Sequence, residues 1–204
     1  MTFQIERVFL NRHPSLASHW GVIEDEETET WLGRDRTPYA LDSRSDVKVL
    51  LAEPSYLDEI AQLHQQAFSD AEETLEASRR YITEALKDSD GLLYILLKEA
   101  QVIGVCTVDL SGNNNYLYGL AVAEAYRGQG YGSYLAKSVV NQLIAQNDKS
   151  FQIAVEDSNV VAKRLYQKIG FVKQTQVVYL KQKEWLHVIR RIWKCTCCDR
   201  ANWS

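Results

Sequence analysis

The sequence lacks the features that mark several large classes of protein. No apolar run approaches the roughly 18 residues that suggest a membrane-spanning helix, and residues 1–7 show no signal-peptide pattern. The net charge of −4 gives no excess of the lysine and arginine with which proteins bind nucleic acid. We therefore expect a cytoplasmic protein that binds neither a membrane nor nucleic acid.

Cysteine is scarce, and its placement does not suit a metal site. Of the four cysteines, Cys106 falls in an expected strand, and the other three crowd the C-terminal tail as Cys195, Cys197 and Cys198. Zinc sites use ligands at looser spacing, and the chain has no partner Cys-x-x-Cys pair. We therefore expect reduced thiols and no bound metal.

The composition is otherwise that of an ordinary globular protein. Hydrophobic residues make up 46% and charged residues 25% of the 204 residues, enough for one sizeable domain with an extension. We divide the chain into a β-rich extension with a linker at 1–46, a main domain at 47–184 and a tail at 185–204. The extension is expected to contain strands at 4–10, 19–23 and 30–33, with a polar turn at the acidic stretch 24–29.

Strand and helix patterns alternate along the main domain, which indicates an α/β fold. The expected elements are a strand at 47–51, helices at 54–68 and about 72–87, strands at 92–97, 101–110 and 116–123, a helix after 132, a strand at 151–155, another helix, and a strand at 175–180. Three sequential strands followed by a helix, a strand and a helix predict a mixed sheet with helices on both faces.

A glycine-rich stretch between a strand and a helix is the first functional motif. Gly128, Gly130 and Gly132 alternate there, although glycine weakens a helix start. A helix start carries unpaired N–H groups and positive partial charge, so a bare backbone there can bind phosphate, and Arg127 adds a guanidinium. The stretch fits neither a P-loop nor a dinucleotide fingerprint, because Ser133 stands where the latter needs glycine.

A second motif follows, beginning at Asn159 and ending at Gly170 and Phe171. Between these ends, Ala162, Leu165, Tyr166 and Ile169 recur at helical spacing and form one apolar face. A polar residue before the helix can cap its start, and Gly170 can close its end. The pattern predicts a short amphipathic helix that packs on the sheet.

Together the two motifs resemble the coenzyme-binding segments of the GNAT superfamily of N-acetyltransferases, over residues 47–181. The resemblance implies a GNAT-like fold, in which helices flank a central, mostly antiparallel sheet whose strands splay apart. It implies acetyl-CoA as co-substrate, with its pyrophosphate on the glycine loop and its pantetheine arm along the preceding strand. The implied coenzyme-binding residues are Leu120, Ala121, Val122, Arg127, Gly128, Gln129, Gly130, Tyr131, Gly132, Ser133, Asn159 and Tyr166.

Acetyl transfer to an amine also requires proton transfer, and the resemblance implies Tyr166 as the general acid. A tyrosine pKa of about 10 keeps its hydroxyl protonated at neutral pH. Some relatives place a glutamate base on the strand before the second motif, where this chain has Ala154. Glu156, two residues later, is the candidate base, and Tyr118, Asp109 and a water relay are left as alternatives.

The resemblance therefore implies an acyltransferase that moves an acetyl group from acetyl-CoA directly to a primary amine of a small molecule, peptide or protein. The alternative is a non-catalytic module that binds acyl-CoA as a sensor. Retention of Tyr166 favours the enzyme, and the missing glutamate at Ala154 favours the sensor. Assembly into a homodimer is left open.

Overall fold

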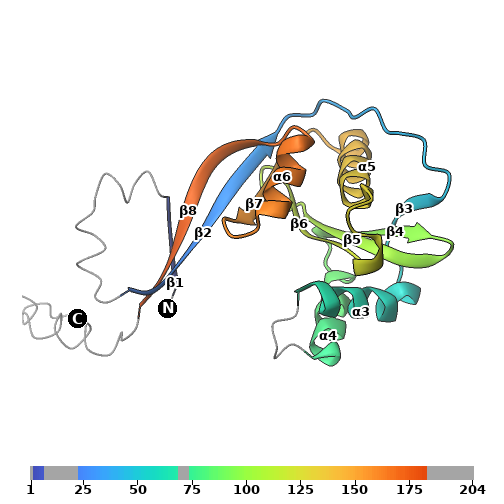
Figure 1. Ribbon diagram of the computed structural model, residues 1–204, viewed down its shortest axis with the longest axis horizontal. Coiled ribbons are helices and arrows are strands. Elements are labelled where there is room, and N and C mark those ends of the chain that lie inside the picture. The colour runs from blue at the N-terminus through green and yellow to red at the C-terminus, as the bar shows by residue number, and fades with distance from the viewer. Residues whose placement is uncertain (1, 7–22, 69–73, 183–204) are drawn as a thin grey trace, which may run out of the picture. The chain divides into compact units, whose positions relative to one another are not determined.

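The computed structural model describes residues 2–6, 23–68 and 74–182 (Figure 1). The chain forms two compact units, which are described separately. The larger unit comprises residues 32–154 and 160–172, and the smaller comprises residues 1–31, 155–159 and 173–204. No helix within the described residues combines the length and the apolar character needed to cross a bilayer.

The larger unit is built around a mixed sheet with strand order β7-β6-β5-β4-β3. All neighbouring pairs are antiparallel except β6 and β7, which run parallel. This arrangement confirms the predicted mixed and mostly antiparallel sheet. The strands are β3 (Val47–Leu51), β4 (Gly91–Lys98), β5 (Gln101–Asp109), β6 (Asn115–Val122) and β7 (Phe151–Glu156).

The parallel strands β6 and β7 separate soon after they meet. Their register covers Asn115 opposite Phe151 and Tyr116 opposite Gln152, and no later residue of β6 has a partner on β7 within the described chain. The splaying of strands that the family resemblance implied is therefore confirmed, and the separation begins after Tyr116. A bulge where β6 pairs with β5, centred on Gly119 with φ of +59°, was not predicted.

Helices cover both faces of this sheet (Figure 1). Helices α3 (Leu57–Phe68) and α4 (Leu75–Ala85) lie on one face, and α5 (Tyr131–Gln146) lies on the other. Their apolar positions are buried as the helical spacing predicts, because each amphipathic helix turns one stripe toward the sheet. The buried stripes comprise Ile60, Leu63 and Ile82 on the α3–α4 face and Leu135, Val139 and Leu143 on α5.

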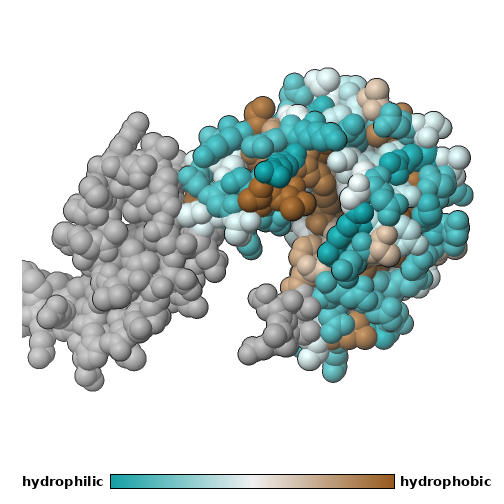
Figure 2. Space-filling view, in the orientation of Figure 1, coloured by the Kyte–Doolittle hydropathy of each residue, from teal (hydrophilic) through white to brown (hydrophobic). Residues whose placement is uncertain are grey.

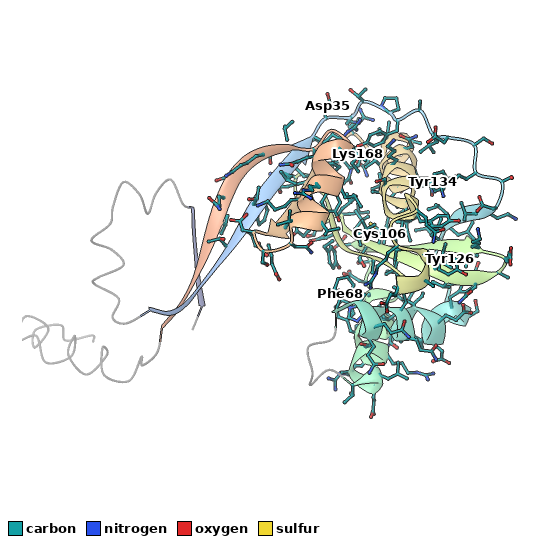
Figure 3. The ribbon with its side chains drawn as sticks, in the orientation of Figure 1. Asp35, Phe68, Cys106, Tyr126, Tyr134 and Lys168 are labelled. Carbon is teal, nitrogen blue, oxygen red and sulfur yellow. The ribbon has the colours of Figure 1, made fainter. Side chains whose placement is uncertain are left out.

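Shorter helical elements connect these layers. Single 3₁₀ turns are η1 (Pro54–Tyr56) and η2 (Glu124–Tyr126), and α6 (Val160–Lys168) contains the second motif. Gly170 ends α6 as predicted, with φ of +89° and the N–H of Phe171 donating to the Tyr166 carbonyl at 3.0 Å. Cys106, whose burial raises the pKa of its thiol to about 12, lies in the interior (Figure 3).

Residues 35–46, here called the strap, include the segment that the sequence analysis assigned to a linker, and they lie along α5. Arg36 Nη2 donates to the Asn147 carbonyl at the C-terminal end of α5 at 3.0 Å. Farther along, the backbone N–H of Tyr39 donates to Asn141 Oδ1 at 2.8 Å, and Asn141 Nδ2 donates back to the Tyr39 carbonyl at 2.9 Å. The strap is therefore attached to the C-terminal end of α5 through Arg36 and to the middle of α5 through Tyr39.

In the smaller unit the strands β1 (Thr2–Glu6), β8 (Val172–Gln182) and β2 (Ile23–Arg34) have the order β1-β8-β2. The predicted turn at residues 24–29 is wrong, because that stretch lies inside β2. The strand is held by distant residues, as the N–H of Asp157 donates to the Thr28 carbonyl at 2.8 Å, and such pairing overrides local turn preference. Residues 7–22 and the tail 185–204 lie outside the described residues, and the three-part division of the chain stays a prediction.

Hydrophilic residues cover most of the surface visible in Figure 2, with hydrophobic patches between them. The most exposed large apolar side chains of the larger unit include Val161 and Val172, at 79% and 65% exposure. Single exposed apolar side chains are normal on protein surfaces, so the arrangement of polar groups carries more information about function.

Candidate functional site

The glycine-rich stretch folds as predicted, as a strand, a sharp loop and a helix start. Strand β6 ends at Val122, η2 follows, and α5 begins at Tyr131. Gly128 and Gly130 have φ of +75° and +81°, the left-handed region that side chains rarely adopt. Two of the three glycines are therefore required by the backbone turn that brings the chain into α5.

The glycines differ in what surrounds them. A Cβ at Gly128 would meet no atom within 4 Å, so the backbone there is bare and accessible. A Cβ at Gly132 would lie 3.2 Å from Leu165 Cδ1, and this glycine therefore permits close packing of α5 against α6. The loop consequently combines an open backbone at its tip with a tightly packed base.

The start of α5 carries positive charge that no acidic group of the helix balances. No side chain caps this helix start, and its first turn contains no acidic residue. Two guanidinium groups lie at it: Arg127 Nε donates to the Val122 carbonyl at 2.9 Å, and Arg44 Nη2 donates to the Gln129 carbonyl at 2.9 Å. Cations are unfavourable at the positive end of a helix, so the arrangement favours an incoming anion.

Tyr131, the first residue of α5, is fixed by a charged cluster. Lys98 Nζ lies 2.8 Å from both Asp46 Oδ2 and the Tyr131 hydroxyl, which itself lies 3.1 Å from Asp46. The hydrogen bond with Asp46 is the main reason that the Lys98 pKa is raised, and the same bond lowers the Asp46 pKa. The Tyr131 side chain is thus buried and engaged, so only its backbone is available to a ligand.

Tyr166, the predicted general acid, lies on α6 with 5% of its surface exposed. Its ring packs edge-on against Phe171, with centroids 5.9 Å apart. Burial, followed by electrostatic interaction with the ionisable groups of Cys106 and Tyr116, raises the Tyr166 pKa above its ordinary value. The hydroxyl therefore stays protonated at neutral pH, as a proton donor requires.

The structure brings together only part of the predicted site. Residues 120–133 and Tyr166 all belong to the larger unit, whereas Glu156 and Asn159 belong to the smaller. Glu156 is exposed and accepts a hydrogen bond from Ser158 Oγ at 3.3 Å. The N–H of Asn159 donates to the Glu156 carbonyl at 2.9 Å, so these two residues form one local turn.

A cavity of about 410 Å³ opens on the α4 face of the sheet. The Glu84 carboxylate at this cavity forms an ion pair with Lys87, whose Nζ lies 3.2 Å from Glu84 Oε1. The cavity is lined by Tyr81, Glu84, Ala85, Lys87, Asp88 and Tyr118. Sequence reasoning singled out only Tyr118, although the helical spacing of Tyr81, Glu84 and Ala85 places these three on one side of α4.

Two of the alternative general bases titrate unfavourably for that task. Burial is the largest cause that raises the Tyr118 pKa, so this hydroxyl stays protonated. Hydrogen bonds from Ser111 lower the Asp109 pKa, which makes that carboxylate a weak base. Neither group is therefore poised to take a proton from an ammonium ion near neutral pH.

Metal ligands are not grouped in the part of the chain that the structure describes. No cluster of three or more His, Cys, Asp or Glu side chains there could hold a metal ion. Cys195, Cys197 and Cys198 lie outside the described residues.

Comparison with known proteins gives a consistent assignment. The sequence model of the acetyltransferase (GNAT) family matches residues 57–171. A curated relative, the [ribosomal protein bS18]-alanine N-acetyltransferase of Haemophilus ducreyi, is 30% identical over 89 residues, which is 42% of this chain and 61% of the relative. The chain thus spans about three fifths of that relative's length.

Solved structures share the fold at low sequence identity. A GCN5-related N-acetyltransferase from Sphaerobacter thermophilus matches with a TM-score of 0.69 and 17% identity, over 88% of this chain and 59% of that one. The ribosomal-protein-S18-alanine N-acetyltransferase from Escherichia coli matches with a TM-score of 0.55 and 16% identity, over 69% of this chain and 98% of that one. At such identities the likeness concerns the fold alone.

Proposed function

Because the chain belongs to the acetyltransferase (GNAT) family, we propose that it is an acetyl-CoA-dependent N-acetyltransferase that acts by direct transfer on a primary amine. The observation that carries this proposal is the start of α5. It combines a bare glycine backbone, two arginines and an absence of acidic groups in the first turn. Phosphate groups suit such a site, because N–H groups and guanidinium groups both donate to anions.

Acetyl-CoA, when bound, supplies an acetyl group activated as a thioester. We assign its pyrophosphate to Arg127 and to the backbone of residues 128–133, and its pantetheine arm to the backbone of Leu120, Ala121 and Val122. Beyond Tyr116, β6 has no pairing with β7 in the described chain, which supports this assignment because backbone groups there are open to a ligand. Asn159 completes the proposed set of coenzyme-binding residues.

Proton transfer is assigned to two side chains. Tyr166 donates a proton to the departing thiolate, and its raised pKa keeps that proton in place until it is needed. Glu156 is the proposed base that takes the proton from the amine. Its exposed carboxylate and the unfavourable pKa shifts of Tyr118 and Asp109 favour this choice over those two alternatives.

The acceptor is proposed to enter the cavity on the α4 face. Asp88 can attract an ammonium group, and the tyrosine rings of the cavity offer faces to a cation. The H. ducreyi relative is a ribosomal-protein alanine N-acetyltransferase, which favours the α-amine of a peptide or protein within the class of primary amines. A cytoplasmic location and assembly as a homodimer stay predictions.

A coenzyme-consumption assay tests the proposal. Purified protein would be incubated with acetyl-CoA and a panel containing polyamines, amino acids, aminoglycosides and peptides that begin with alanine, and released thiol would be measured. We expect acceptor-dependent release that the Tyr166→Phe variant largely loses. Tight binding of acetyl-CoA without release on any amine would contradict the enzyme and support an acyl-CoA sensor.

A further inference from the structure

Arg44 reaches the glycine loop from the strap, some 85 positions away in the sequence. Its Nη2 donates to the Gln129 carbonyl at 2.9 Å, and its guanidinium lies 4.6 Å from the ring centroid of Tyr131. A Cβ placed on Gly130 would lie 3.3 Å from the same Nη2, so the loop backbone and the guanidinium are in close contact. The side chain is therefore held at the tip of the loop by a hydrogen bond and by a cation–π contact.

The charge of Arg44 is unusual for its position. At the opposite end of α5, Arg36 donates to helix carbonyls and pairs with Asp148 at 2.9 Å, which suits the negative end of the helix. Arg44 instead lies at the positive end, and no carboxylate of the described residues pairs with it. Both arginines belong to the strap, but only Arg36 is electrostatically satisfied.

Most of the hydrogen-bonding capacity of Arg44 is also unused. A guanidinium carries five N–H donors, and Gln129 is its one hydrogen-bond acceptor within the described chain. The hydrogen bond to Gln129 and the contact with the Tyr131 ring hold this half-buried group beside the backbone of Gly130. Such a fork suits the oxygens of a phosphate group.

We propose that Arg44 is a second phosphate-binding residue of the coenzyme site, acting beside Arg127. The inference rests on the proposed function, since the phosphate is one of those of acetyl-CoA. The strap then has a function in binding: the hydrogen bonds between the Tyr39 backbone and Asn141 hold it against the middle of α5, and it carries Arg44 to the loop. A phosphate between the two guanidinium groups also removes the unfavourable charge at the start of α5.

The experiment measures the dissociation constants of acetyl-CoA and of 3′-dephospho-CoA by calorimetry, at low and high salt. The proteins are the parent, Arg44→Ala, Arg44→Lys and a matched control, Arg36→Ala, which removes the other strap arginine. We expect Arg44→Ala to weaken acetyl-CoA binding about ten- to a hundredfold and to make its salt dependence shallower. Arg44→Lys keeps the positive charge but loses the forked donors of the guanidinium. Its affinity for acetyl-CoA should lie between those of the parent and Arg44→Ala.

The control separates binding from support of the strap. Arg36→Ala should lower the melting temperature while leaving affinity within about threefold and the salt dependence unchanged, since its contacts lie at the far end of α5. If Arg44→Ala loses affinity for both coenzymes equally, the contacted phosphate is the pyrophosphate. If its loss vanishes with 3′-dephospho-CoA, the contacted group is the ribose phosphate.

Three outcomes would decide against the inference or its premise. Parent-like affinity of Arg44→Ala overturns it, provided that Arg127→Ala is weakened. Loss of affinity with an unchanged salt dependence also overturns it, because Arg44 would then only support the loop. Failure of the parent protein to bind either coenzyme contradicts the proposed function itself. This outcome differs from the first two, in which the parent binds acetyl-CoA.

Discussion

Helices α4 and α5 begin in opposite ways. At α4, Thr74 Oγ1 accepts a hydrogen bond from the N–H of Ala77 at 3.2 Å, and Glu76 adds negative charge to the first turn. At α5, Gly130 stands at the cap position with no side-chain bond, no acid follows, and Arg44 and Arg127 lie nearby. The start of α4 therefore has a side-chain partner for a free N–H group and negative charge near the positive end of its dipole. The start of α5 has neither, so its N–H groups and positive charge are available to another molecule.

The chain gives up local stability at the start of α5. A side-chain cap is worth about 0.5–2 kcal/mol to a helix, and a glycine inside the first turn, such as Gly132, adds an entropic cost. Helix α5 tolerates both because it is long and its apolar stripe is fully buried. Substitutions at the start of α4 should therefore change the free energy of unfolding, and substitutions at the start of α5 should change affinity for acetyl-CoA. Substitution of Tyr166 should change turnover. This residue is close to the α5 start, because its neighbour Leu165 packs beside Gly132.

The largest expected effect is on turnover. Tyr166→Phe keeps the buried ring and its packing on Phe171 but removes the proton donor. General acid catalysis contributes about 10²–10⁴-fold, so we expect kcat at saturating acetyl-CoA to fall by that factor. Because the Tyr166 pKa is raised, the group stays protonated and the loss should be the same across about pH 6–9.

Calorimetry with acetyl-CoA and circular dichroism are the controls for that variant, and both should match the parent. Full turnover by Tyr166→Phe would show that another group protonates the thiolate. A loss that disappears at alkaline pH, where a tyrosine of lower pKa would already have lost its proton in the parent, would contradict the raised pKa.

The second effect is on affinity. Arg127→Ala removes a charged donor at the α5 start, and such hydrogen bonds contribute about 1.5–3 kcal/mol, so acetyl-CoA should bind roughly ten- to a hundredfold more weakly. Because Arg127 is exposed, the variant's free energy of unfolding, measured with urea, should differ from that of the parent by less than about 0.5 kcal/mol. The matched control is Arg80→Ala, an exposed arginine on α4, which should change neither quantity. Parent-like affinity of Arg127→Ala would remove the proposed contrast between the helix starts.

The third effect is on stability alone. Thr74→Ala removes the cap of α4 and should lower the free energy of unfolding by about 1 kcal/mol. Thr74→Ser, which keeps the hydroxyl, serves as the control and should retain most of that stability. Acetyl-CoA affinity should be unchanged in both variants, and a parallel loss of affinity would mean that the two helix starts are not independent.

The smallest effect makes the α5 start resemble that of α4. Ser133→Asp places an acid in the first turn of α5, which should raise the free energy of unfolding by about 0.3–1 kcal/mol. The same carboxylate repels phosphate, so acetyl-CoA binding should weaken. Ser133→Asn, similar in size but uncharged, should do neither. A variant that gains stability and also binds more tightly would contradict an anion site at this position.

The sequence allowed the loop and its helix to be predicted because their signals are local. Gly128, Gly130 and the helical spacing around Tyr166 each reflect the conformation of the residues that carry them. The mostly antiparallel character of the sheet and the splaying of its strands were implied only by the family resemblance, and the structure confirms both.

Features that depend on distant partners could not be predicted in this way. The acidic residues 24–29 look like a turn, but β2 is stabilised by hydrogen bonds from elsewhere in the chain, including that of Asp157. Arg44 stands in a polar segment with no pattern of its own, and only folding brings it to Gln129. The cavity on α4 likewise needed the packing of Tyr81 beside Tyr118 to become visible.

The separation of β6 from β7 has a consequence for the protein without its coenzyme. Beyond Tyr116, β6 presents backbone groups that β7 does not pair within the described chain, so the sheet contains an open edge at a position normally occupied by a neighbouring strand. Open edges recruit extended chains, including strands of other molecules. A bound pantetheine arm would cover this edge. The coenzyme would then reduce self-association of the protein as well as supply acetyl groups.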